Sequence, residues 1–120
     1  MKVAGIGFRG AAEVSSLLAA LERAGGNVQA LATARIKAEA PQLVELSRRL
    51  DLPILPIEPE ILARQVTPTP APRAETRFGP GSLAEAAALA AAGPGARLIA
   101  PRVTSPDGMA TAAIAEGTPS

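Results

Sequence analysis

A glycine-rich hexapeptide near the start of the chain contains residue types suited to anion binding. Residues 5–10, GIGFRG, match the pattern G-x-G-x-x-G between a short apolar run and a helical pattern. Backbone N–H groups of such a loop approach an anion at a helix N-terminus, where the helix dipole also favours negative charge. Arg9 adds a guanidinium that can hold a carboxylate through two parallel hydrogen bonds. The pattern predicts a strand-to-helix loop that receives an anionic ligand.

The same pattern has two other interpretations. A nicotinamide dinucleotide site needs an acidic residue roughly 20 positions further on, at the end of the second strand. The segment Thr33-Ala34-Arg35 ends that strand here, and the next acid is Glu39, which weakens this interpretation. Arg35 would suit a 2′-phosphate, so a phosphorylated nucleotide stays open. Alternatively, the glycines only allow a tight turn and close approach of the helix to the sheet.

Composition excludes several kinds of chemistry. The chain has no histidine and no cysteine, which removes Ser-His and Cys-His nucleophiles and zinc-thiolate sites. We therefore expect no metal site and no cofactor. Twelve Lys and Arg against eleven Asp and Glu give a net charge of +1, with the basic residues scattered and only 2% aromatic residues. Nucleic acid is therefore not the expected partner, because binding to its phosphate backbone requires a concentrated basic patch on the protein.

Hydropathy predicts a cytoplasmic protein with no membrane partner. No apolar run reaches the roughly 18 residues of a membrane-spanning helix. The first residues, MKVAGIG, enter a strand pattern directly, without the cationic leader and long apolar region of a secretory signal.

The elements that must position these residues follow from apolar periodicity. The chain has 120 residues with 48% hydrophobic content, which predicts a single domain over 1–120. Alternation of strand and helix patterns predicts an α/β fold. Its mostly parallel sheet has about five strands and ends in an antiparallel hairpin around the turn Ser105-Pro106-Asp107-Gly108. The predicted strands are 3–7, 28–33, 54–57, 97–102 and 109–115, and the predicted helices are 11–24, 41–50, 58–65 and 83–92.

Two further features lie before the last predicted helix. The segment 66–77 contains three prolines among small and polar residues, which predicts an extended, flexible flap or crossover. Ser82 is predicted to be the N-cap of helix 83–92, with Glu85 three residues later completing a capping box.

The order of these motifs resembles the CobE family of cobalamin biosynthesis, which is similar to the C-terminal domain of the CbiG proteins. The resemblance rests on GIGFRG, on ATARIKAEAPQLVELSRRLDLPI, on FGPGSLAEAAALAAAG and on the final strand ending AIAEG. It covers nearly all of the chain.

The resemblance implies a three-layer α/β/α fold and a role in the corrin-ring part of vitamin B12 synthesis. The implied ligand is a polycarboxylate intermediate such as a precorrin or hydrogenobyrinic acid, held by a carrier or accessory protein, with other enzymes of the pathway as possible partners. Basic groups would neutralise its acetate and propionate side chains. The ligand-binding residues would be Gly5, Gly7, Arg9, Gly10, Thr33, Lys37, Glu39, Ser82 and Arg102.

Two other functions stay open from the sequence. The longer CbiG proteins open a lactone ring with loss of acetaldehyde, so a hydrolase of the same pathway is one alternative. Its candidate acid/base groups are Glu39 and Glu85, although a helix-start acid and a capping residue account for them more simply. A nucleotide-binding module that uses GIGFRG is the second alternative. We favour the non-enzymatic interpretation.

Overall fold

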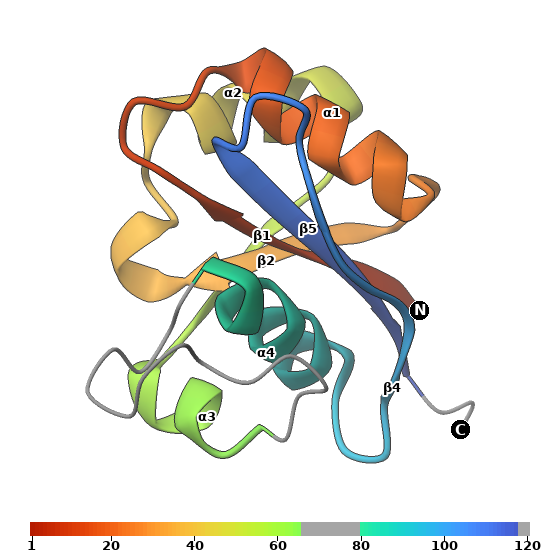
Figure 1. Ribbon diagram of the computed structural model, residues 1–120. Helices are drawn as coiled ribbons and strands as arrows, with labels where there is room; N and C mark the ends of the chain where they lie inside the picture. Colours follow the sequence, from red (N-terminus) through yellow and green to blue (C-terminus); the bar gives the residue numbers. More distant parts are fainter. Residues whose placement is uncertain (66–79, 118–120) are drawn as a thin grey trace.

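Strand β1 (Lys2–Phe8) occupies the centre of the sheet, and the other elements are arranged around it (Figure 1). The structure is a computed structural model that describes residues 1–65 and 80–117, except for the side chains of residues 80–82. The other strands are β2 (Ala30–Ala34), β3 (Ile54–Ile57), β4 (Arg97–Thr104) and β5 (Ala110–Glu116). The helical elements are α1 (Val14–Ala24), the 3-10 turn η1 (Arg35–Lys37), α2 (Pro41–Leu50), α3 (Pro59–Ala63) and α4 (Pro80–Ala92).

The sheet is mixed, with the order β3-β2-β1-β5-β4 within the described residues. The pairs β1–β2 and β2–β3 are parallel because helical crossovers α1 and α2 connect their strands. Strand β5 is antiparallel to β4, because a tight turn joins the two strands, and it is also antiparallel to β1. The predicted α/β fold with a C-terminal antiparallel hairpin is confirmed. The prediction of a mostly parallel sheet is right for the directions of the strands, but β5 is antiparallel to both of its neighbours.

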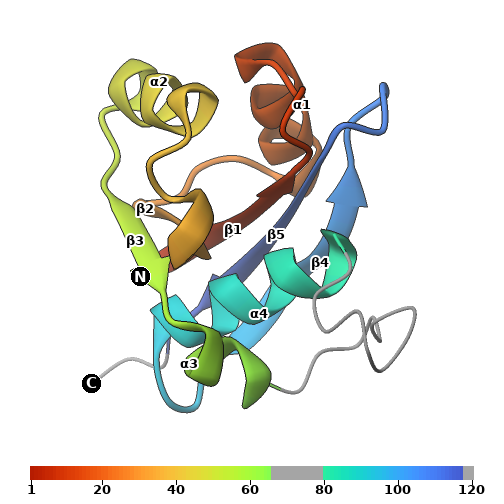
Figure 2. The ribbon, with the colours of Figure 1, turned by 90° about the vertical axis from the view of Figure 1, so that its left-hand side faces the viewer.

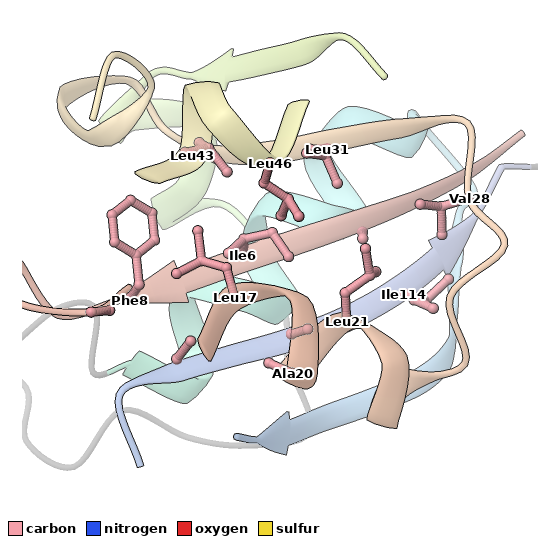
Figure 3. Packing of buried hydrophobic residues seen from close by; sticks show 14 residues of the cluster. Ile6, Phe8, Leu17, Ala20, Leu21, Val28, Leu31, Leu43, Leu46 and Ile114 are labelled. Carbon is pink, nitrogen blue, oxygen red and sulfur yellow. The ribbon is translucent and has the colours of Figure 1, made fainter. Parts of the chain in front are cut away.

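The sheet lies between two helical layers (Figure 2), and alternate residues of β1 face one layer or the other. Helices α1 and α2 cover one face, where Ala4, Ile6 and Phe8 pack with their leucines (Figure 3). Helices α3 and α4 cover the other face, where Val3 packs against Leu62, Leu83 and the alanines of α4. Side chains that alternate between the two faces, with a period of two residues, are expected for a strand that is buried on both faces of the sheet.

The predicted glycine-rich loop is wrong in one respect, because most of GIGFRG is strand. Gly5 pairs with Ala32 on one side and with Ala113 on the other, and β1 continues to Phe8. Helix α1 starts only at Val14, after an intervening segment. Gly5 is required by packing: a Cβ built on it would lie 1.9 Å from the carbonyl oxygen of Ala84 in α4. Gly7 faces the same side because it is two residues further along the strand.

The predicted start of the last helix is also wrong. Helix α4 begins at Pro80, so Ser82 lies inside its first turn and not at its N-cap. Proline fits this position because its fixed φ is helical and its missing N–H would have no partner there. The carboxylate of Glu85 is buried and accepts a hydrogen bond from the backbone N–H of Arg102, at 3.0 Å. The predicted flexible segment 66–77 lies outside the described residues.

The turn between β4 and β5 is tied to α1 through Asp107. Its Oδ1 accepts hydrogen bonds from the Ser105 hydroxyl, at 2.6 Å, and from the Met109 backbone N–H, at 3.0 Å. Its Oδ2 accepts a hydrogen bond from the hydroxyl of Ser16 in α1. These bonds, that of Ser105 first, lower the pKa of Asp107 below its ordinary value.

We expect Gly5→Ala to destabilise the fold strongly, while Gly10→Ala serves as a matched control. The new methyl group at residue 5 meets the backbone of α4, which cannot move aside like a flexible side chain. Such overpacking costs about 3 kcal/mol of unfolding free energy. A Cβ on Gly10 meets no atom within 4 Å, so its change should stay within about 0.5 kcal/mol. Urea denaturation measures both, and equal stabilities of the two variants would contradict the packing role of Gly5.

The pKa of Asp107 makes the hairpin acid-sensitive. A carboxyl whose pKa is lower in the folded state stabilises the fold above its unfolded pKa of about 4, and this contribution is lost as the pH falls through the folded value. We expect Ser16→Ala to raise the pKa of Asp107 towards its ordinary value, because one donor is removed. NMR titration of the Asp107 carboxyl checks this, and an unchanged titration midpoint would show that the Ser16 bond contributes nothing.

Candidate functional site

A pocket of about 210 Å³ opens beside the carboxyl end of β1. Here the chain order reverses, because β1 is flanked by β2 on one side and by β5 on the other. Ligands of open α/β sheets bind at such switch points, outside the carboxyl ends of the strands. The described residues that line the pocket are Gly7, Phe8, Arg9, Lys37, Leu83, Gly108, Met109, Ala110 and Thr111.

Two cationic residues line this pocket. The Nζ of Lys37 donates a hydrogen bond to the carbonyl of Phe8, at 3.0 Å, and lies 4.9 Å from the centroid of the Phe8 ring. Residue Arg9 is exposed, and its backbone N–H bonds to the carbonyl of Met109, at 3.0 Å. Thus β1 and η1 bring together two basic residues that are 28 positions apart in the sequence. That they bind a ligand stays a prediction.

The remaining pocket wall is largely apolar, and apart from Gly7 it was not predicted from the sequence. Strand β5 supplies much of it, because its pairing places Ala110 opposite Phe8 and Thr111 opposite Gly7. The hydroxyl of Thr111 donates to the carbonyl of Gly7, at 3.4 Å. No local pattern marks these residues as part of a site, because the site forms only when two strands about a hundred residues apart in the sequence pair with each other. None of the described lining residues carries a carboxylate, so the fixed charge of the lining is positive.

Several other residues predicted to bind ligand have structural partners. Thr33 is fully buried, and its hydroxyl donates to the carbonyl of Ile6, at 2.8 Å. The carbonyl of Gly10 accepts a hydrogen bond from the side-chain amide of Gln42, at 3.2 Å. Gly5 lies under α4. These interactions give each of the three residues a structural role that requires no bound ligand.

Two further predicted residues, Glu39 and Arg102, are not among the described residues that line the pocket. Glu39 is exposed and follows η1. Arg102 is exposed on the edge strand β4. The side chain of Ser82 is outside the described part of the structure.

The geometry removes the basis for a dinucleotide site. That fingerprint needs glycines in a turn that opens directly into a helix. Here, Gly5 and Gly7 lie within β1. The guanidinium of Arg35, the candidate for a 2′-phosphate, forms an ion pair with Glu58, whose hydrogen bond and charge raise the pKa of Arg35.

Two other kinds of site were sought in the described residues. No three Asp or Glu side chains of this part of the chain gather in a group that could hold a metal ion. Among the same residues, no helix has the length and apolar character needed to cross a bilayer.

Comparisons with known proteins agree with the resemblance noted from the sequence. The model of the family described as cobalamin synthesis G C-terminus matches residues 2–115. The structure of the cobalamin biosynthesis protein chiG from Agrobacterium tumefaciens is 34% identical with a TM-score of 0.75, covering 99% of this chain and 100% of that one. The structure of CobE, a protein of the cobalamin biosynthetic pathway, is 32% identical with a TM-score of 0.77, covering 96% and 89%.

A more distant structure shows the fold alone. It is that of a putative cobalamin biosynthesis protein G homolog from Sulfolobus solfataricus, 18% identical with a TM-score of 0.63. This chain covers 36% of that protein, and 95% of this chain is matched. No curated protein sequence matches significantly. From the family match and the two similar structures, the chain belongs to the cobalamin synthesis G C-terminus family and is a cobalamin biosynthesis protein of the CbiG/CobE type.

Proposed function

We propose that the protein binds a polycarboxylate corrinoid intermediate, such as a precorrin or hydrogenobyrinic acid, and acts as its carrier or accessory protein. The observation that carries the proposal is the pair of cations, Arg9 and Lys37, on one largely apolar pocket. Acetate and propionate side chains are the anionic groups of such a ligand. Both cations offer charge-assisted hydrogen bonds to a carboxylate.

The pocket volume sets how such a ligand binds. Pockets that enclose a drug-sized molecule have volumes of about 300 to 1,000 Å³. The 210 Å³ at this site is smaller, so it takes a carboxylate side chain and not the macrocycle. The ring then rests outside, at the carboxyl edge of the sheet. Such partial enclosure fits a protein that hands its ligand on.

A hydrolytic role for this site has less support. Of its two candidate acid/base residues, Glu39 is exposed and lies outside the lining of the pocket. Glu85 is fully buried and bonded to the backbone of β4, away from water that it would need to activate. Mass spectrometry of a lactone-bearing precorrin after incubation separates the two roles: unchanged mass supports a carrier, whereas loss of acetaldehyde on opening of the lactone supports the hydrolase.

The direct test of binding is co-elution. Purified protein is mixed with hydrogenobyrinic acid and passed through a desalting column, and the visible absorbance of the protein fractions is recorded. We expect coloured protein fractions with about one ligand per chain. Colourless fractions at micromolar protein, together with no thermal stabilisation by the ligand, would contradict the proposal.

Substitution of the two cations should weaken binding to different extents. Lys37→Met keeps the aliphatic stem and removes a charge that is half-buried, so the dissociation constant should rise about tenfold. Arg9→Ala removes an exposed charge and should raise it about threefold. Arg48→Ala, an exposed residue of α2 that is not in the pocket lining, is the matched control with unchanged affinity.

Titration calorimetry at two salt concentrations measures these constants. Binding should weaken as ionic strength rises, because salt screens exposed charges. If Lys37→Met and Arg48→Ala bind equally well, the pocket is not where the carboxylates bind.

A further inference from the structure

Helix α4 carries a buried carboxylate that does not line the pocket. Glu85 is 0% exposed. A carboxylate in the interior requires compensating hydrogen bonds, since its desolvation is otherwise costly. One of them comes from the backbone N–H of Arg102 in β4, which lies 3.0 Å from the Oε2 of Glu85. This bond joins a helix to the edge strand of the sheet.

Strand β4 is irregular at the point where Glu85 holds it. Ala100 pairs with Ile114 and Val103 pairs with Ala112, so three steps along β4 match two steps along β5. The extra residue makes this a β-bulge at Pro101 and Arg102, and a bulge changes the direction of the side chains it contains. The carboxylate of Glu85 therefore fixes the backbone of the bulge itself.

The bulge lies at the same end of the sheet as the pocket. Immediately after it, Thr104 of β4 pairs with Thr111 of β5, and Thr111 lines the pocket. Helix α4 places Leu83 in the pocket lining two residues before Glu85. The exposed Arg102 thus lies on the strand next to β5, which supplies Thr111 to the pocket lining.

We propose that Glu85 is a positioning residue, whose buried carboxylate fixes the β4 bulge and so directs Arg102 towards the ligand as a third cation. This rests on the proposed corrinoid binding. A ligand whose macrocycle lies outside the pocket carries other carboxylates around its ring, and one of these would reach Arg102. The planar guanidinium of Arg102 can donate two parallel hydrogen bonds to such a carboxylate.

Two substitutions of Glu85 separate its geometry from its charge. Glu85→Gln keeps an oxygen at the same reach and removes the charge, so hydrogenobyrinic acid should bind within about twofold of wild type. Glu85→Asp keeps the charge and withdraws the carboxylate by one methylene, so the bulge is released and the dissociation constant should rise about two- to fivefold, as for loss of one exposed ionic contact. The reverse order of the two variants would overturn the positioning role.

A double-mutant cycle with Arg102→Ala tests whether Glu85 acts through Arg102. We expect Arg102→Ala to raise the dissociation constant about two- to fivefold, and Glu85→Asp to add nothing in that background. Additive effects of the two substitutions would overturn the proposal. Unchanged affinity of Arg102→Ala would also overturn it, and this test remains available even if Glu85→Asp fails to fold. Failure of the wild-type protein to bind would instead reject the proposed function itself.

Discussion

The close approach of helix α4 to strand β1 is the constraint on which the rest of the structure depends. At Gly5 the backbone carbonyl of Ala84 occupies the space that a side chain would need. On the helix side, Ala84, Ala87 and Ala88 are buried with little or no exposure. Small residues on both surfaces allow the helix to approach the sheet closely. A core nearly without aromatic residues is therefore still closely packed.

This close packing also determines where the functional residues lie. Because α4 crosses β1 at Gly5, it places Leu83 over the carboxyl end of β1, in the pocket lining. The same helix brings Glu85 against the edge strand β4. On the opposite face, leucines of α1 and α2 cover Ile6 and Phe8, and the carbonyl of Phe8 anchors Lys37. The proposed anion site thus consists of the side chains of Arg9 and Lys37, and not of a loop of backbone N–H groups.

Local sequence patterns predicted most of the elements and three of the pocket residues, Gly7, Arg9 and Lys37. The apolar periods, the glycines after α1 and the proline at the start of α2 are local signals, and the elements occur within a few residues of their expected positions. The glycine spacing left two interpretations open, because a pattern of alternate glycines is shared by phosphate loops and by strands under a close-packed helix. Only the position of Ala84 opposite Gly5 distinguishes the two cases.

The remaining pocket wall depends on contacts that a single sequence does not reveal. Met109, Ala110 and Thr111 join the site through the pairing of β5 with β1, and Glu85 finds its backbone partner through a bulge in β4. Both are long-range contacts.

The most direct measurement of the central claim is a crystal structure of the protein with hydrogenobyrinic acid. The account predicts one ligand carboxylate between the side chains of Arg9 and Lys37, with the macrocycle outside the pocket at the carboxyl edge of the sheet. A corrinoid bound elsewhere, for example in the groove between α1 and α2 lined by Leu18, Leu50 and Leu52, would contradict it.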